Sequence, residues 1–362
     1  MPSRIYDNFF PDQISVSNSH SLCIDNGELI GWGSPAKDKL EFPKDIAKCV
    51  KVSCGYSHTA MITSSGRLFS VGNSNGGKLS NSTDVNFTDV KCSRNYTAAL
   101  RKKDATVLMV FGDQTPYRAL PSSLYCRKTI SSGAFSINNI SQFDISDDGV
   151  IVIATEDCLL YRIHHSQQSI GASESNVVSI LNRFEGNVAF YLTDEREAYR
   201  IFNNENGELA RERVRIDCSS IFNGNKYYGC ATSKSLSMFG DHFGYIKLPV
   251  GWNIRNVVGG NNGYALTVSD VNSGFHTILV GDNTKNKELV IGTLDFRECP
   301  RIKTADTSVD LLVYDVRENK ERIKVVSSTT SKIVDGNHEC KPCGFRFTAN
   351  ISTCPLCKCG CE

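Results

Sequence analysis

Six of the fifteen cysteines lie in the last 23 residues of this 362-residue chain. Four of them form two Cys-x-x-Cys pairs, and ten residues separate the pairs. Each pair fits a tight turn that lets two thiolates point at one centre, and thiolates are ligands that Zn²⁺ prefers. We therefore predict one tetrahedral zinc ion, Zn²⁺, bound by Cys340, Cys343, Cys354 and Cys357.

The two cysteine pairs resemble the knuckles of a zinc ribbon. Cys340-Lys341-Pro342-Cys343-Gly344 matches the form C-x-x-C-G, and Cys354-Pro355-Leu356-Cys357 matches C-P-x-C. Four thiolates would fill the zinc shell and leave no position for water, so we expect a structural site. The alternative is a redox-active cysteine tail without metal. Cys359 and Cys361 could replace a ligand, hold part of a second metal or stay unbound, and His338 is a spare candidate ligand.

Upstream of these cysteines, one short pattern recurs along the chain. In its clearest copy, VSCGYSHTAMITSSGRLFSVGN at 52–73, two apolar runs flank Ser64-Ser65-Gly66. Apolar runs of strand length joined by a short glycine-containing turn predict a β-hairpin. Eight copies of varying clarity are found at 14–33, 52–73, 90–112, 143–163, 186–201, 224–240, 257–281 and 309–326.

The copies recur at a nearly constant spacing. Their closing positions, 33, 72, 112, 163, 201, 240, 281 and 326, lie 39, 40, 51, 38, 39, 41 and 45 residues apart. A period near 40 residues fits four short strands, and radial arrays of such units are β-propellers. We attribute the interval of 51 residues to an insertion after Ile130–Gly133, a segment that resembles the start of the second hairpin.

Two stretches carry a family resemblance. Cys54-Gly55-Tyr56-Ser57-His58-Thr59-Ala60 and GRLFSVG at 66–72, with Ile30-Gly31-Trp32-Gly33 before them, resemble the RCC1 repeat (regulator of chromosome condensation). The family pattern is C-G-x-x-H-T followed by a turn and a W-G strand. The resemblance spans about residues 10–330 and implies an all-β, seven-bladed RCC1-like β-propeller. Eight hairpins leave open an eighth blade, or a terminal hairpin outside the ring.

We expect two domains, the propeller at 1–330 and a zinc-ribbon-like Cys-rich segment at 331–362. The chain has 40 basic and 39 acidic residues, and this balance disfavours a broad basic field for nucleic acid. No apolar run is long enough to span a membrane, and the start of the chain lacks the features of a secretory signal. The other nine cysteines are scattered singly, which is typical of small buried side chains in a reducing compartment such as the cytoplasm.

The sequence contains none of the catalytic motifs that we sought: a phosphate-binding loop, a G-x-S-x-G elbow or an H-E-x-x-H helix. His20 and His58 occupy the same slot of two repeats, which indicates structural histidines that bond across a blade. Asp147-Asp148 and Asp194-Glu195 fall at hairpin turns, where aspartate is common for conformational reasons. We therefore predict no catalytic residue and no small-molecule substrate.

These observations favour a non-enzymatic protein–protein interaction scaffold or a structural component of a larger assembly, including a virus or phage particle. The propeller-face loops and the ribbon would bind protein partners, with no membrane attachment and with nucleic acid as a less favoured partner. The alternative, implied by the resemblance, is guanine-nucleotide exchange on a small GTPase or chromatin-associated regulation of the RCC1 type. Exchange in that family depends on a protruding β-wedge and particular face residues, and we cannot map either onto this sequence.

Overall fold

The structure of this protein is a computed structural model, and it divides into two compact units, residues 11–221 and residues 1–10 with 222–362. The described residues are 3–281 and the strands between 311 and 347. The gaps in this description are 8–12, 18–19, 26, 34–37, 44–45, 47, 81–83, 103–105, 165–166, 174, 183–187, 225–226, 241–243, 248–250, 260–262, 270–274, 282–310, 316–319, 327–330, 336–337, 341–344 and 348–362.

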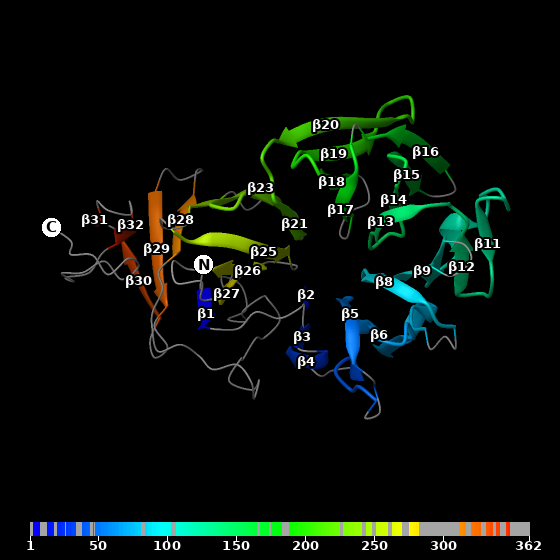
Figure 1. Cartoon of the computed structure of the whole chain (residues 1–362), viewed down its shortest axis with the longest axis horizontal. Helices are drawn as coiled ribbons and strands as arrows, with labels where there is room; N and C mark the ends of the chain where they lie inside the picture. The colour runs from blue at the N-terminus through cyan, green and yellow to red at the C-terminus, as the bar shows by residue number, and fades with distance from the viewer. Residues whose placement is uncertain are drawn as a thin grey trace. The chain divides into compact units, whose positions relative to one another are not determined.

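Five antiparallel sheets form the described part of the 11–221 unit, and they follow one another in chain order (Figure 1). The first two are three-stranded, with β2 (Gln13–Val16), β3 (His20–Asp25) and β4 (Glu28–Gly33), then β5 (Cys49–Cys54), β6 (His58–Thr63) and β7 (Leu68–Gly72). The fourth and fifth are four-stranded, with β13 (Ile140–Ile145), β14 (Ile151–Thr155), β15 (Leu159–His164) and β16 (Gln167–Ala172), then β17 (Val177–Leu181), β18 (Ala189–Thr193), β19 (Ala198–Asn203) and β20 (Leu209–Arg215).

The predicted hairpin at 52–73 is confirmed. Strands β6 and β7 pair in antiparallel register, with Met61 opposite Phe69. The turn closes through a hydrogen bond of 2.8 Å from the Gly66 amide to the Thr63 carbonyl. Gly66 adopts φ 75°, a left-handed conformation that glycine reaches without steric cost. The apolar runs and the Ser-Ser-Gly turn of the sequence therefore act as predicted.

The third sheet explains the long interval between the third and fourth hairpins, and it corrects our interpretation of it. Its strands are β8 (Phe87–Cys92), β9 (Thr97–Lys102), β10 (Thr106–Phe111), β11 (Tyr125–Arg127) and β12 (Ser132–Phe135). We expected 130–133 to open the next hairpin, but β12 instead pairs with β10, and β11 pairs with β12. The extra length is therefore a pair of added strands at the edge of the third sheet.

Within the other unit, the N-terminal strand closes a sheet of C-terminal strands. Strand β1 (Ser3–Asp7) pairs with β27 (Phe275–Gly281), which pairs with β26 (Gly263–Ser269), and β25 (Asn253–Gly259) completes this sheet. The sequence pattern gave no sign of this pairing. An edge strand that joins two distant parts of the chain has no local signature, because its partner is set by which backbone edge stays open.

A seven-stranded sheet contains the sixth and eighth sequence hairpins together. Its strands are β21 (Ser220–Gly224), β22 (Tyr227–Ala231), β23 (Ser235–Gly240), β24 (Gly244–Lys247), β28 (Leu311–Asp315), β29 (Lys320–Val326) and β30 (Ser331–Asp335). The eighth hairpin thus adds to an existing sheet at the β24–β28 pair. A separate hairpin joins β31 (His338–Cys340) to β32 (Phe345–Phe347). The domain boundary at residue 330 stays a prediction.

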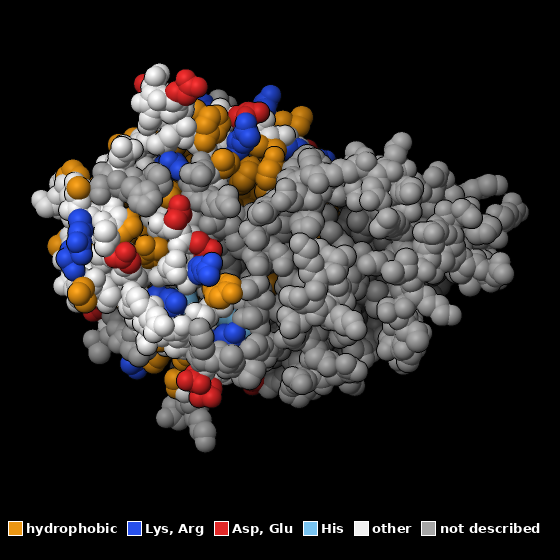
Figure 2. Space-filling model, turned by 180° about the vertical axis from the view of Figure 1, so that it is seen from behind, with side chains coloured by type: hydrophobic (Ala, Val, Ile, Leu, Met, Phe, Trp, Pro, Cys, Tyr) orange, Lys and Arg blue, Asp and Glu red, His pale blue; other side chains and the backbone are white. Residues whose placement is uncertain are grey.

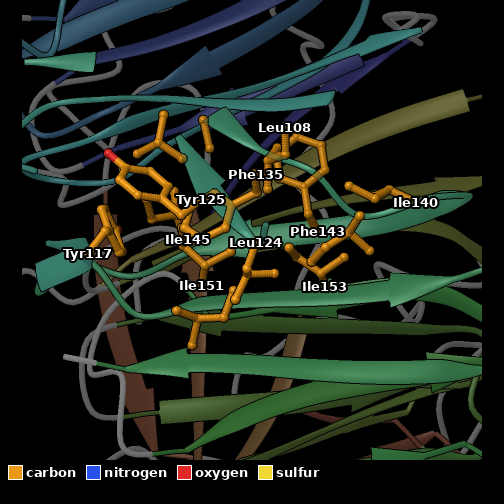
Figure 3. Packing of buried hydrophobic residues seen from close by; sticks show 14 of the residues in the cluster. Leu108, Tyr117, Leu124, Tyr125, Phe135, Ile140, Phe143, Ile145, Ile151 and Ile153 are labelled. Carbon is orange, nitrogen blue, oxygen red and sulfur yellow. The ribbon is translucent and has the colours of Figure 1, made fainter. Parts of the chain in front are cut away.

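The core of the 11–221 unit lies between successive sheets. One cluster joins the third sheet to the fourth, with Tyr117, Tyr125 and Phe135 packed against residues such as Phe143 and Ile151 (Figure 3). Similar clusters join the first sheet to the second, the second to the third, and the fourth to the fifth. Central strands such as β6 and β14 are buried at every position because both faces of each sheet meet a neighbour. No helix within the described residues is long and apolar enough to span a membrane.

Candidate functional site

The two repeat histidines lie in the core and bind the next repeat. His20 and His58 are both fully buried. His20 Nε2 lies 2.8 Å from Thr59 Oγ1, and His58 Nε2 lies 2.9 Å from Thr97 Oγ1. Both pairs are 39 residues apart, one repeat length. The prediction that these histidines are structural is therefore confirmed. We expected each to bond within one blade, whereas each bond joins two successive sheets.

The threonine hydroxyls determine the direction of the two histidine–threonine hydrogen bonds. Thr59 Oγ1 donates to the Lys39 carbonyl at 2.9 Å, and Thr97 Oγ1 donates to the Lys78 carbonyl at 2.8 Å. A hydroxyl has one hydrogen to donate, so each threonine must accept from its histidine. Nε2 therefore donates to the threonine in both repeats. These hydrogen bonds connect successive sheets.

Glycines make room for the His58 ring. A Cβ atom on Gly55 would lie 2.3 Å from His58 Cε1 and 2.6 Å from the Ser93 carbonyl oxygen, both far inside contact distance. Gly72 adopts φ 112°, and a Cβ there would lie 2.7 Å from His58 Cα. The Cys-Gly-x-x-His pattern thus has a packing cause, because the ring occupies the space that any other residue at 55 would need.

A second set of contacts repeats at the ends of the first strands. The Cys54 amide donates to Ser15 Oγ at 2.9 Å, and the Cys92 amide donates to Ser53 Oγ at 2.8 Å. In the fourth sheet, Asp144 takes the serine position, and its carboxylate accepts from the Asn182 amide at 2.7 Å. Asp144 is buried, and its role is explained by this backbone contact.

Tyrosine replaces histidine in the third repeat. Tyr96 is buried beside Gly112, where φ is 133° and a Cβ would lie 2.6 Å from the tyrosine ring. Burial raises the pKa of Tyr96 to about 12, and Asp113 and Asp148 add to the shift. Tyr117, which is fully buried nearby, donates a hydrogen bond of 2.6 Å to the Gly149 carbonyl. Burial also raises its pKa well above the usual value.

Tyr125 and Gln114 complete this cluster. The Tyr125 hydroxyl donates to Gln114 Oε1, and Gln114 Nε2 donates to the Gly112 carbonyl at 2.8 Å. Burial raises the pKa of Tyr125 to about 12. The three phenols stay neutral over the usual pH range, and the hydroxyls of Tyr117 and Tyr125 donate to a backbone carbonyl and a side-chain amide. The cluster therefore packs the third sheet against the fourth.

The paired acidic residues occupy turns, as predicted. Asp148 accepts a hydrogen bond from the Ser146 hydroxyl in a turn that ends at Gly149, where φ is 85°. Asp194 accepts from the Asn176 side chain at 3.0 Å in an exposed connection. These carboxylates therefore fix loop conformations.

The scattered cysteines are mostly buried, as predicted. Six of the eight described ones lie in the core, Cys126 is exposed and Cys158 is half-buried. Of the predicted zinc ligands, Cys340 ends strand β31, and only its backbone is described. Cys343, Cys354 and Cys357 lie outside the described residues. The searched part of the chain holds no group of three or more potential metal ligands, and it does not include these cysteines.

One surface was missed by the sequence reasoning. Tyr56, between the buried residues Gly55 and Ser57, and Arg94 and Asn95 in the third repeat form the exposed ends of otherwise buried loops. There the Arg94 guanidinium lies 4.7 Å from the centre of the Tyr56 ring. The Asp147 carboxylate accepts from the Arg94 amide at 2.5 Å. The first variable position of the repeat pattern, Tyr56 in the second repeat and Arg94 in the third, was the available signal, because its side chain is exposed in both repeats.

Comparison with known proteins finds one matching repeat model and several solved structures of similar fold. Residues 49–77 match the family model of the regulator of chromosome condensation (RCC1) repeat. Yeast Prp20p is similar in structure, with a TM-score of 0.54 and 11% identity over 75% of this chain and 83% of Prp20p. Yeast RCC1 (Prp20) bound to Kap60 gives a TM-score of 0.54 and 12% identity over 75% of this chain and 81% of that one.

Human WBSCR16 is also similar, with a TM-score of 0.50 and 9% identity over 77% of this chain and 99% of WBSCR16. At these identities the likeness shows the fold alone. The chain therefore has an all-β fold of the RCC1-like propeller type, and the number of blades stays a prediction.

Proposed function

We propose that this chain is a non-enzymatic protein-interaction module that binds partner proteins through the loops at the ends of its sheets. The observation that carries the proposal is the position of His20 and His58, the repeat histidines. Both are fully buried, and both bind a threonine of the next repeat. A general acid or base must reach its substrate, and these side chains are committed to holding sheets together. The buried histidines thus stabilise the packing of the sheets, and the exposed loops are available to bind partner proteins.

The likeness to yeast Prp20 supports a role in protein interaction or RCC1-type regulation. The structure of Prp20p is described together with its binding to Gsp1p and histones, and a second structure contains Kap60. Those partners belong to the yeast protein. For this chain they support protein partners as a class, and they do not point to a place in a virus particle.

Mixed surface charge supports protein partners over nucleic acid. Lysine and arginine side chains alternate with carboxylates and apolar groups on the described part of the face in Figure 2. Several arginines on this unit are paired, for example Arg213 with Glu197 at 2.9 Å and Arg196 with Asp217 at 2.9 Å. Paired charges give a weak long-range field, whereas binding to a phosphate backbone needs a basic surface.

A zinc ribbon at the C-terminus would serve as a second docking element. The donor set consists of soft thiolates, which suit zinc. Strands β31 and β32 pair in antiparallel register, with Cys340 opposite Phe345. Cys340 and Cys343 would then hold the metal from this hairpin, and Cys354 and Cys357 would hold it from the second pair. Bound zinc would supply folding energy to this short segment.

Reduced thiolates at such a site, and the predominantly buried cysteines of the repeats, suit a reducing compartment such as the cytoplasm.

A binding experiment and an exchange assay test the proposal together. The full chain, immobilised and exposed to extract of its native source, should retain specific proteins. Each retained protein, once purified, should bind with a measurable Kd and a defined stoichiometry in calorimetry. The rate of nucleotide release from small GTPases of the same source should change by less than about twofold, a difference below about 0.5 kcal/mol. Acceleration by tenfold or more would instead establish an exchange factor of the RCC1 type.

A further inference from the structure

The β11–β12 hairpin presents an isolated apolar side chain to solvent. Its strands, Tyr125–Arg127 and Ser132–Phe135, pair at the edge of the third sheet, and residues 128–131 form the tip between them. Ile130 lies on this tip and is 81% exposed. Exposing an isoleucine costs solvation free energy that burial in a partner would recover.

The tip is held in one conformation by its own hydrogen bonds. The Lys128 and Thr129 amides donate to the Ser132 carbonyl at 2.9 and 3.0 Å. Thr129 Oγ1 and Ser132 Oγ lie 2.7 Å apart, and Arg127 Nε donates to the Thr129 carbonyl at 2.9 Å. The turn is therefore already formed before a partner binds. Binding would cost the turn little conformational entropy.

The tip is anchored to neighbouring loops. The Gly112 amide donates to the Ser131 carbonyl at 2.9 Å. Gly77 packs so closely that a Cβ there would lie 2.1 Å from Ser131 Cβ. Gly77 belongs to the connection that follows β7, and the first residue of that connection, Asn73, donates to the Ser57 carbonyl at 2.9 Å. The tip and the Tyr56–Arg94 pair therefore lie at the same end of the second and third sheets.

We define the tip surface as the exposed residues Tyr56, Arg94, Arg127, Lys128 and Ile130. It has three cations, an aromatic ring and one isoleucine. Asp113 lies in the connection between β10 and β11, and its pKa is lowered chiefly by hydrogen bonds from Thr115, with smaller effects of Arg118 and Arg127. Asp147 lies in the turn between β13 and β14, and its carboxylate accepts a hydrogen bond from the Arg94 amide. Three cations, Arg94, Arg127 and Lys128, against the two carboxylates of Asp113 and Asp147 leave an excess of one positive charge at this end of the sheets.

We propose that the tip surface docks a partner protein that offers an apolar pocket bordered by carboxylates. Ile130 would fill the pocket, while Arg94, Arg127 and Lys128 would pair with the acidic border. An aliphatic anchor favours a protein over nucleic acid, which is bound through phosphates and base stacking. This inference rests on the proposed function and specifies the surface by which it is carried out.

The test replaces Ile130 by the photocrosslinking residue p-benzoylphenylalanine in the full chain. A second chain carries the same residue at Ile216, an isoleucine that follows β20 and is 61% exposed. After irradiation in cells of the native source, mass spectrometry identifies adducts of each chain. The adduct specific to position 130 is then purified as a protein, and calorimetry gives its Kd for wild type, Ile130→Asp, Arg127→Ala with Lys128→Ala, and the control Ile216→Asp.

We expect a protein adduct at position 130, with Kd weakened about 30-fold by Ile130→Asp and about tenfold by the double variant. The effect of the double variant should shrink at high salt, and Ile216→Asp should change Kd by less than about twofold. Circular dichroism should show the same fold for every variant.

Three results would overturn the inference. One is equal weakening by Ile130→Asp and Ile216→Asp, and another is a nucleic-acid adduct at position 130. The third is a bound partner whose Kd is insensitive to Ile130→Asp, in which case the proposed function survives and only its surface is wrong. Absence of any bound protein in both this test and the extract experiment would remove the proposed function itself.

Discussion

A buried histidine between two repeats acts as a connector. His58 Nε2 donates to Thr97 Oγ1, and the same threonine donates to the Lys78 carbonyl. This chain of bonds crosses from the second sheet to the third inside the core. Removing the ring would leave a cavity and deprive the threonine of its donor, and both effects are costly where no water can substitute.

We expect His58→Ala to lower the free energy of unfolding by about 3 kcal/mol. Urea unfolding followed by far-UV circular dichroism measures this change. Ser74→Ala, at an exposed position of the connection after β7, is the control and should change stability by less than about 0.5 kcal/mol. A loss below about 1 kcal/mol for His58→Ala would contradict the connector role.

Gly55 is expected to tolerate no side chain. The added Cβ of Gly55→Ala would clash with the His58 ring on one side and with the Ser93 carbonyl of the next repeat on the other. Backbone cannot give way cheaply, so stability should fall by about 2–3 kcal/mol.

The matched control is Gly76→Asn. Gly76 has φ 76° and no atom within 4 Å of an added Cβ, and asparagine tolerates this left-handed conformation. Its free energy of unfolding should change by less than about 1 kcal/mol. Similar losses for the two variants, measured by urea unfolding, would show that packing around His58 is not the cause.

The buried tyrosines should make the protein sensitive to alkali. The pKa of Tyr96 and of Tyr125 is about 12 in the fold, above the usual value of 10. The folded state therefore keeps its protons where the unfolded chain has lost them. The two tyrosines make their full contribution to the free energy of unfolding below pH 10. This contribution is lost progressively as the pH rises from 10 toward 12.

Urea unfolding between pH 8 and about 12, with tyrosinate absorbance recorded in parallel, measures this loss. Tyr96→Phe keeps the ring and removes the titrating hydroxyl, so its stability should fall less steeply above pH 10 than that of wild type. Identical slopes for Tyr96→Phe and wild type would contradict this assignment.

Among the elements, strand β1 depends on a distant partner. It pairs with β27 over five residues, from Ser3 opposite Val280 to Asp7 opposite His276. Without β1, the backbone of β27 would present an open edge. Deletion of residues 1–10 should therefore raise the hydrogen-exchange rate of amides in 275–281 by about tenfold or more.

Strands β14 and β15 belong to the other compact unit and provide the internal control for this deletion. Their amide exchange rates should stay the same. Unchanged protection of 275–281 in the deleted chain would mean that β1 does not stabilise this sheet.

At the scale of the whole chain, zinc content tests the C-terminal segment. The full chain, after exchange into metal-free buffer, should contain about one zinc ion by mass spectrometry of the metal. Cys340→Ser combined with Cys357→Ser should abolish binding, because each change removes a thiolate from one pair. Cys126→Ser is the matched control, since Cys126 is an exposed cysteine of the repeats, and it should leave zinc content unchanged. Retention of zinc by the double variant would refute the ribbon.

The repeating hairpins were predictable because their signals are local. Apolar runs and glycine turns act within about ten residues, and segments such as 58–63 and 68–72 therefore form strands as expected. The periodicity of the sequence also predicted that His20 and His58 occupy equivalent positions in two repeats. The extra strands of the third sheet were not predictable, because residues 130–133 resemble the start of a hairpin, whereas the strand that begins at Ser132 pairs with β10.

The sequence by itself determined an all-β chain of recurring hairpins, because turn chemistry and the alternation of side chains are set by near neighbours. Only the tertiary structure decided which group each repeat offers to the next, such as the His20–Thr59 and Ser15–Cys54 contacts across 39 residues. It also decided that β1 joins β27 and that Ile130 stays in solvent. These outcomes depend on the packing of sheets and on which backbone edges remain open, and neither leaves a mark on a single stretch of sequence.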